Sequence, residues 1–530
     1  MFKNLKHIAF WPAFILIGGA IVLNFANNEL FNTIFNAANN FFMAHMGWFA
    51  NILTVVCLAV CIWAMFSKFG DVRIGGKDAK PTLSNFSWFS ISLTSTLAAG
   101  LLLWGPSEPI YHIQDPASAI TGYAPMSGDA YLFASETMFM HWSFLPYGIM
   151  AIAGVAFAFM YFNAKGKYSV STMLAPVLGK HNNEKAGSIV DGFILFAITI
   201  AIASSLGALL LNINYGIEYT TGINSNNTTM LVVVVVLVAL TVGSAVLGLK
   251  KGIKILADFN VYGYIILIAA ILLLGPTSYI LNLGTEGFAS FLTHIFDRSM
   301  ITGAAHQTQW PQWWTTFYWA SYYAWTPTIG LFLGSIAYGR TIRQFLGVNL
   351  FMSGGFGALW VMIFGNTSLE RQVSGVVDLV KVSIEKGVGA IPYESLGTLP
   401  LGMAICILYL VIMLISFVTS VNANISVMAG LATKNISLED PTGAPSYQKV
   451  LWGVISAALA YIVGSTIGID GLKALCNVAG IAAIFIQLGI VAAVVMLVMR
   501  WRKYDQTGTY ASSDTAAVDM ETAQVSNQST

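Results

Sequence analysis

The sequence is poor in charged residues for its length. Of its 530 residues only 9% are charged, whereas 56% are hydrophobic, and the net charge is +1. Soluble domains carry about 25% charged residues, and a soluble core stops growing with chain length, so it cannot bury this much apolar surface. A lipid bilayer can. The small net charge gives no reason to expect nucleic acid as a partner.

Patterns of metal sites, disulfide frameworks and catalytic centres are also missing. The four cysteines, Cys57, Cys61, Cys406 and Cys476, stand inside apolar runs and are interpreted as small core residues. No His-x-x-x-His pair, paired-carboxylate motif or phosphate loop occurs. These absences disfavour a membrane-embedded enzyme and predict no cofactor. A channel is disfavoured because no repeated filter motif is present.

What the sequence does contain is long apolar runs. A helix that crosses a bilayer needs about 20 mostly apolar residues. Twelve such stretches lie near residues 8–26, 47–66, 87–113, 136–162, 189–211, 230–248, 256–278, 312–338, 349–366, 400–424, 450–468 and 475–499. We therefore predict an all-α integral membrane protein with one domain over 1–503. Residues 504–530 are polar and predict a disordered cytoplasmic tail.

Basic residues give the orientation of these spans. If the N-terminus is inside, 20 of the 25 Lys and Arg residues fall in inner segments and 5 in outer segments. Cytoplasmic loops carry such an excess, so we expect both termini in the cytoplasm of a multi-pass protein of the cell (inner) membrane. The segment 284–298 has apolar residues at helical spacing, which predicts a helix along the outer surface.

Three spans contain helix-breaking or strongly polar residues at membrane depth. They are Gly100 and 105–109 (GPSEP) in span 3, 325–327 (WTP) in span 8 and 417–424 (FVTSVNAN) in span 10. Breaks in spans are tolerated where they line a cavity or are buried in protein, and breaks in both halves of a chain point to a transporter with a site near the midplane. We predict a break at each position and a solute site between them.

Few ionisable residues stand inside the spans, and each is a functional candidate. Glu136, Asp191 and Asp258 are interpreted as residues that tie helices together. Glu108 has two open interpretations, because it either caps broken backbone or contacts a ligand. His141 has no metal-ligand companions in the sequence pattern and is interpreted as a packing residue.

Aromatic residues are dense over 310–325 and recur in span 4. Trp310, Trp313 and Trp314 fit an interfacial belt. Tyr322 and Trp325 lie deeper and share a helix face, and Trp142 and Tyr147 stand in span 4. Aromatic faces attract cations, and quaternary ammonium groups are bound in such cages. Ordinary aromatic packing is the alternative.

Several of these stretches resemble the betaine/choline/carnitine transporter family. The similar stretches are 313–345, 69–88, 104–109 (WGPSEP), His141-Trp142, 204–209 (SSLGAL) and 417–420 (FVTS). The resemblance implies two N-terminal helices followed by two inverted five-helix repeats, spans 3–7 and 8–12. It also implies a homotrimer that transports a quaternary-ammonium, sulfonium or related zwitterionic solute.

Carried over by position, the aromatic box of this family falls on Trp142, Tyr147, Met150, Ser321, Tyr322 and Trp325. The sequence departs from the pattern of this aromatic box in two places. Ser321-Tyr322 stands where a Trp-Trp pair is usual, and Met150 stands where a Tyr is frequent. Tyr is a weaker cation host than Trp, so the resemblance leaves the identity of the solute open.

The resemblance also implies an ion site. Thr419 and Ser420 match the hydroxyl pair that binds sodium in sodium-coupled members, with span 3 carbonyls near Thr94 and Leu97 completing the shell. Exchangers of the carnitine type carry an arginine where this chain has Asn260. We therefore expect a sodium-coupled importer, with sodium-independent exchange as the alternative. For the ion site itself there is a separate alternative, in which the Thr419 and Ser420 hydroxyls bind no ion and donate to backbone carbonyls one turn earlier.

Overall fold

The computed structural model describes residues 4–96, 98–247, 253–436, 443–466 and 468–508. These residues form α-helices and contain no sheet, only two isolated β-bridges. The α-helices in chain order are α1 His7–Ala26, α2 Asn28–Phe66, α3 Asn85–Ser95, α4 Ala98–Gln114, α5 Ser118–Thr121, α6 Gly128–Trp142, α7 Phe144–Ala158, α8 Val170–Leu178, α9 Glu184–Thr221, α10 Asn227–Leu247, α11 Lys254–Leu274, α12 Thr277–Ser299, α13 Trp310–Trp313, α14 Thr315–Ser335, α15 Ile342–Leu346, α16 Ser353–Val373, α17 Leu379–Glu385, α18 Ile391–Leu396, α19 Gly402–Leu431, α20 Ser446–Thr466 and α21 Gly468–Arg500. The expectation of an all-α protein is confirmed.

Many of these helices suit a membrane. Within the described ranges, nine helical stretches are long and apolar enough to cross a bilayer, or ten if the bent pair α3 and α4 counts as one span. The amphipathic segment 284–298 is helical, as predicted, within α12, which packs on α6 and α16. The predicted tail falls, beyond residue 508, outside the described residues.

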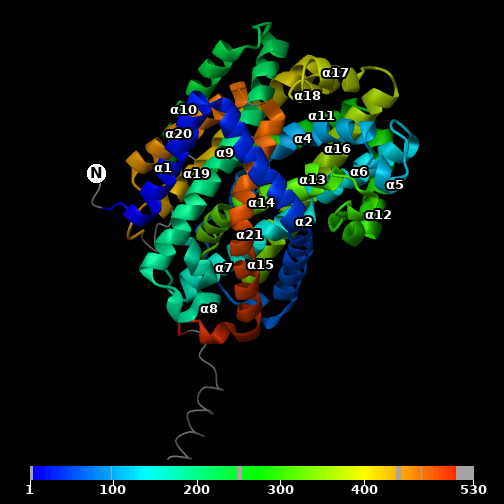
Figure 1. The fold of residues 1–530 in the computed structure, drawn as a ribbon. Coiled ribbons are helices and arrows are strands. Elements are labelled where there is room, and N and C mark those ends of the chain that lie inside the picture. The colour runs from blue at the N-terminus through cyan, green and yellow to red at the C-terminus, as the bar shows by residue number, and fades with distance from the viewer. Residues whose placement is uncertain (1–3, 97, 248–252, 437–442, 467, 509–530) are drawn as a thin grey trace, which may run out of the picture.

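Helix α14 lies in the middle of the bundle, among α2, α7, α9, α19 and α21 (Figure 1). It is rich in hydroxyl and aromatic residues, which suit contact with protein rather than lipid. Every residue of α14 is buried except Trp325. Helix α14, which contains the aromatic residues singled out in the sequence, is therefore almost completely enclosed by its neighbours.

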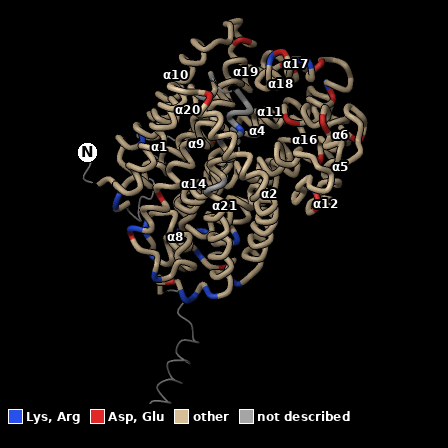
Figure 2. The backbone as a smooth tube through the Cα atoms, viewed as in Figure 1, with Lys and Arg blue, Asp and Glu red and all other residues tan. Residues whose placement is uncertain are grey.

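Both ends of the described chain lie at the same end of the bundle. The Asn163 carbonyl accepts from the Gln506 amide (2.8 Å), near the C-terminal end, and the Asn163 Oδ1 accepts from the Gly75 amide (2.9 Å), in the loop after α2. Nearby, Lys6 Nζ donates to the Tyr168 carbonyl (3.1 Å). Lys and Arg gather at this end, around α8 (Figure 2). This arrangement agrees with an even number of crossings between the two termini.

The break in span 3 is not where the sequence predicted it. The chain leaves helical geometry at Thr96 (φ −98°, ψ −106°), between α3 and α4, while α4 continues through Pro106 and Pro109. Proline removes the N–H that would bond the carbonyl four residues earlier, which for Pro106 is the carbonyl of Leu102. The Tyr409 hydroxyl donates to that carbonyl. A side chain from α19 therefore lets the helix continue.

The predicted breaks in spans 8 and 10 are wrong. Helix α14 runs through Pro327, and the hydroxyls of Thr326 and Thr328 donate to carbonyls of the same turn (2.7 and 2.9 Å). Helix α19 runs unbroken over 417–424. Its polar side chains find partners instead, as when Asn422 Nδ2 donates to Ser244 Oγ of α10 (2.9 Å). Polar side chains can satisfy a membrane helix without interrupting it.

Two breaks that the sequence analysis missed lie beside aromatic residues. Ser143 (φ −110°, ψ −124°) separates α6 from α7 directly after Trp142, and Trp314 (φ −124°, ψ −83°) separates α13 from α14. Neither position carries glycine or proline. Together with the break at Thr96, they interrupt three helical runs in the part of the bundle that contains the site, and the helices on either side of Thr96 are bent by 54°.

Candidate functional site

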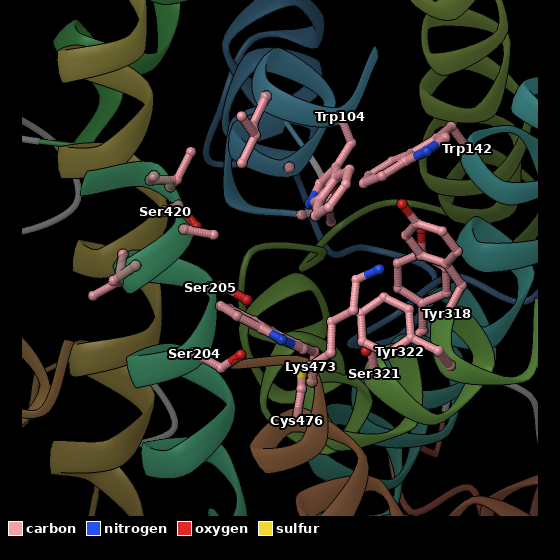
Figure 3. A pocket seen from close by; sticks show the side chains of 18 of the residues that line it. Trp104, Trp142, Ser204, Ser205, Tyr318, Ser321, Tyr322, Ser420, Lys473 and Cys476 are labelled. Atoms are coloured by element: carbon pink, nitrogen blue, oxygen red, sulfur yellow. The ribbon is translucent and has the colours of Figure 1, made fainter. Parts of the chain in front are cut away.

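A cavity of about 110 Å³ lies where these elements meet. Its walls come from the break between α3 and α4 and from α6, α7, α9, α14, α19 and α21. Figure 3 shows the rings of Trp142, Tyr318 and Tyr322 on one side and the hydroxyls of Ser204, Ser205 and Ser420 on the other, while Trp325, like Ser204, contacts Cys476. One wall therefore offers π faces and the other offers hydroxyl groups.

The rings on the aromatic side pack against one another. The Trp142 ring stands edge-on to Tyr318 and Tyr322, with centroids 5.2 and 6.2 Å away. Tyr318 and Tyr322, one helical turn apart on α14, are stacked at 5.9 Å. A Cβ at Gly100 would come within 3.0 Å of the Trp142 ring, so glycine lets the ring lie against α4. The rings are held in place before any ligand arrives.

Glu108 of α4 is the anchor behind these rings. It is fully buried, and its Oε1 accepts from His112 Nε2 (2.9 Å) and His141 Nδ1 (2.6 Å). Its Oε2 accepts from Trp142 Nε1 (2.7 Å) and the Tyr318 hydroxyl (2.5 Å). Charge-assisted hydrogen bonds of this kind are about twice as strong as neutral ones. Glu108 neither caps a break nor lines the cavity. It fixes the rings of Trp142 and Tyr318, which do line the cavity.

His141 does have companions, contrary to the sequence interpretation. Glu108, His112 and His141 bring three possible metal-ligand atoms within 4.8 Å of one another. The histidines come from different helices, which hid the cluster in the sequence. The ligand atoms already lie at hydrogen-bond distance, and Glu108 accepts four bonds, which matches the lone-pair sites of a carboxylate. In this structure the cluster is therefore a hydrogen-bond network centred on Glu108.

Five of the six predicted box residues line the cavity: Trp142, Met150, Ser321, Tyr322 and Trp325. The Ser321 hydroxyl is buried beside Cys476 and has no oxygen or nitrogen partner among the described residues. The sixth residue, Tyr147, is fully buried on α7 outside the lining, with its ring beside Gly357 of α16. The break at Ser143 lies between Trp142 and Tyr147, so the two residues do not share one helix face.

The predicted sodium residues are partly brought together. Ser420 lines the cavity with Thr96, whereas Thr94 and Thr419 are buried behind it. The Thr94 hydroxyl donates to the Ser90 carbonyl (2.8 Å), and the Thr419 hydroxyl donates to the carbonyls of Ile415 and Ser416 (both 3.1 Å). Leu97 lies outside the described residues.

Asn260 does not line the cavity. Its Nδ2 donates to Ser416 Oγ and to the Tyr264 hydroxyl, each at 2.9 Å, and so joins α11 to α19. The Ser416 carbonyl in turn accepts from Thr419. Asn260 is therefore linked through one residue to the hydroxyl pair.

The other intramembrane carboxylates tie helices together, as expected. Glu136 of α6 faces Arg298 of α12 (3.3 Å), and Asp191 of α9 pairs with Lys6 (3.1 Å). Asp258 of α11 accepts from Ser87 of α3 (2.9 Å). None of the three is among the residues that line the cavity.

Sequence reasoning missed several residues that line the cavity: Thr96, Trp104, Ser204, Ser205, Tyr318 and Lys473. The sequence contained a signal for Tyr318, because it stands four residues before Tyr322 and therefore lies on the same helix face. The sequence also contained a signal for Lys473, because Lys473 and Asp470 are charged residues at the start of an apolar run.

This geometry agrees with the comparison with known proteins. The model of the betaine/carnitine/choline family transporters matches residues 8–506. The chain belongs to this family. Members of this family are transporters, so the enzyme alternative is set aside.

Two curated relatives in this transporter family are similar over almost their whole length. The glycine betaine transporter OpuD of Bacillus subtilis (strain 168) is 29% identical over 484 residues, which are 91% of this chain and 92% of the relative. The ectoine/hydroxyectoine transporter of Virgibacillus pantothenticus is 26% identical over 472 residues, 89% and 92% of the two chains.

Proposed function

We propose that this protein imports a betaine-like solute, a quaternary ammonium, sulfonium or related zwitterion, across the cell membrane in symport with sodium. The observation that carries this proposal is the cavity whose aromatic wall is fixed by Glu108. A methylated onium group cannot donate hydrogen bonds, so it is recognised by π faces. Glycine betaine and ectoine, the solutes named for two relatives, each join a cationic nitrogen centre to a carboxylate.

The residues around Ser420 suit sodium chemically. Sodium is a hard cation and, by analogy with other hard cations, takes oxygen ligands. The hydroxyls of Ser90, Ser92 and Ser95, at the end of α3 next to the break, are buried without a partner in the described structure. A hydroxyl that donates its proton to a backbone carbonyl keeps its oxygen lone pairs, so the bonds of Thr419 do not exclude it. The proposed ligands are Thr94, Leu97, Thr419 and Ser420.

The proposal includes the architecture that the family resemblance implies. The ten candidate spans, counted with the bent pair, would become the twelve that we expect if α14 and α20 also cross the membrane. We infer two inverted repeats, a homotrimer and cytoplasmic termini. The last point is supported by the Lys and Arg residues at the end where both termini lie.

Uptake into proteoliposomes tests this function. With radiolabelled glycine betaine outside, we expect accumulation that requires an inward sodium gradient and stops when potassium replaces sodium. Uptake that ignores sodium and is driven only by preloaded glycine betaine would favour the exchanger. No uptake and no binding of betaine, ectoine or a sulfonium analogue would reject the solute class.

A further inference from the structure

Ser321 differs from the other hydroxyl residues of α14. Five more Ser and Thr residues stand on this helix, and each hydroxyl has an oxygen or nitrogen partner: Thr315, Thr316, Thr326, Thr328 and Ser335. The Ser321 hydroxyl is buried and has no such partner among the described residues. Buried polar groups are nearly always hydrogen-bonded. A buried hydroxyl without a partner is therefore a candidate ligand contact where it borders a cavity.

The Ser321 side chain lines the cavity beside Trp325. The two residues stand four apart on α14, so they are neighbours on one face of the helix. Both side chains also contact Cys476 of α21. Figure 3 shows Ser321 next to Tyr322, at the edge of the same cavity. A cationic group that lies on the Trp325 ring is therefore within one helical turn of the Ser321 hydroxyl.

The part of this hydroxyl that lacks a partner is its oxygen lone pairs. A serine hydroxyl has one proton to donate and two lone pairs that accept. The proton can go to the Cys476 sulfur, a weak acceptor that lies beside it. Within the described part of the chain, no oxygen or nitrogen group donates to the lone pairs. A ligand group that fits here carries a donor hydrogen, which a fully methylated nitrogen lacks.

A cationic nitrogen that keeps an N–H can satisfy both the rings and this hydroxyl. Its charge and its remaining alkyl groups lie on the ring faces, while the N–H donates to Ser321 in a charge-assisted hydrogen bond. A trimethylammonium group would instead place a methyl against the oxygen and leave it unpartnered. A site that hydrogen-bonds an N–H of its ligand discriminates strongly against an analogue that lacks the N–H.

We propose that Ser321 is a specificity-determining residue that accepts a hydrogen bond from an N–H on the cationic nitrogen of the solute. The preferred solutes are then zwitterions whose nitrogen retains an N–H: partly methylated amino acids, cyclic imino acids and cyclic amidines such as ectoine. Fully methylated betaines bind more weakly in the same cavity. This inference rests on the proposed function and narrows its solute class.

Equilibrium binding to the purified full chain tests the proposal. The probes are glycine betaine and N,N-dimethylglycine at neutral pH, where both nitrogens are positively charged. The two compounds share the carboxylate and differ in one group on the nitrogen, a methyl in the first and a hydrogen in the second. We expect the wild type to bind dimethylglycine about tenfold more tightly, the magnitude of one hydrogen bond to a charged group. Ser321→Ala removes the acceptor, so the ratio of the two dissociation constants should fall to about one.

Ser335→Ala is the matched control. Ser335 stands on the same helix and is as buried as Ser321, each residue being 8% exposed. Its hydroxyl, however, donates to the Leu331 carbonyl (2.6 Å), and it is not among the residues that line the cavity. The ratio of the two dissociation constants should therefore keep its wild-type value in this variant.

Three results would overturn the inference. One is a wild type that binds glycine betaine as tightly as dimethylglycine or more tightly, a comparison that needs no variant to fold. Another is an undiminished ratio in folded Ser321→Ala. The third is an equal fall of the ratio in Ser335→Ala, which would assign the effect to helix α14 in general. A wild type that binds neither probe nor ectoine would instead reject the proposed function itself.

Discussion

At the residue scale, the site depends on Glu108. Its carboxylate accepts four hydrogen bonds in a fully buried position and thereby fixes Trp142 and Tyr318. Glu108→Gln keeps the shape but replaces one acceptor oxygen by a donor, which leaves at least one buried donor without a partner. Each such loss costs about 1–3 kcal/mol. We expect a lower melting temperature together with weaker binding of glycine betaine.

Glu136→Gln is the matched control for this change. Glu136 is also a buried carboxylate of the membrane region, but it faces Arg298 and Ser290 of α12 and does not contact the rings. We expect a lower melting temperature with unchanged affinity. If both variants weaken binding equally, Glu108 acts through general stability rather than through the rings.

The box residues on α14 could be placed from helical spacing, whereas the break at Ser143 could not be located from the sequence. Ser321, Tyr322 and Trp325 follow helical spacing on α14, and all three line the cavity. Tyr147, on the first turn after Ser143, lies outside the lining; the one local sign of the break was Pro146, which lacks the N–H that would bond the Trp142 carbonyl. The Glu108 network was also out of reach, because its partners stand on three elements.

At the scale of elements, breaks and continuity are decided by partners on other helices. Pro106 leaves the Leu102 carbonyl without its helical donor, and the Tyr409 hydroxyl of α19 supplies one. Tyr409→Phe should therefore destabilise the protein by about 1–3 kcal/mol, the cost of an unsatisfied buried carbonyl. Thermal or denaturant unfolding of the purified protein measures this loss.

A double-mutant cycle isolates the bond. In a Pro106→Ala background the alanine N–H can bond to Leu102, so removing the Tyr409 hydroxyl should cost clearly less than it does in the wild type. Equal losses in the two backgrounds would show that Tyr409 contributes by packing alone. The sequence revealed the proline but not the donor, which explains the wrongly positioned break in span 3.

The hydroxyl pair of α19 makes a second prediction at this scale. If sodium is bound there, Thr419→Ala with Ser420→Ala should raise the sodium concentration for half-maximal uptake by roughly tenfold, equivalent to about 1.4 kcal/mol. Ser426→Ala is the control, since that hydroxyl donates within the same helix to Asn422, to its carbonyl (2.9 Å) and its Oδ1 (3.5 Å). An unchanged sodium dependence in the double variant would place the ion elsewhere.

At the scale of the molecule, orientation is open to a direct test. Both termini and the loop after α2 lie at one end of the bundle, where Lys and Arg gather. Lys77→Cys should resist an impermeant thiol reagent added outside intact cells, whereas Lys381→Cys, in an outer segment, should react. The four native cysteines are buried and add little background. Rapid labelling at position 77 would reverse the topology.

Composition and the distribution of charged residues were enough to predict most features of the molecule as a whole. Low charge, apolar runs and the distribution of Lys and Arg lead to an all-α membrane protein with its ends on one side. The sequence could not show that α14, the aromatic helix, is enclosed by its neighbours, because hydropathy does not separate lipid-facing from protein-facing residues. Nor could it show that breaks at Thr96, Ser143 and Trp314 converge on one region.

The central claim is that the ring faces around the cavity bind the cationic end of a betaine. The dissociation constant of glycine betaine, measured by calorimetry on purified wild type, Trp325→Leu and Trp313→Leu, tests it most directly. Trp325 lines the cavity, whereas Trp313 is 67% exposed at the end of α13. A desolvated cation–π contact contributes about 2 kcal/mol, so Trp325→Leu should raise the constant by roughly tenfold or more, and Trp313→Leu should leave it nearly unchanged. Equal effects of the two changes, or no saturable binding to the wild type, would contradict the account.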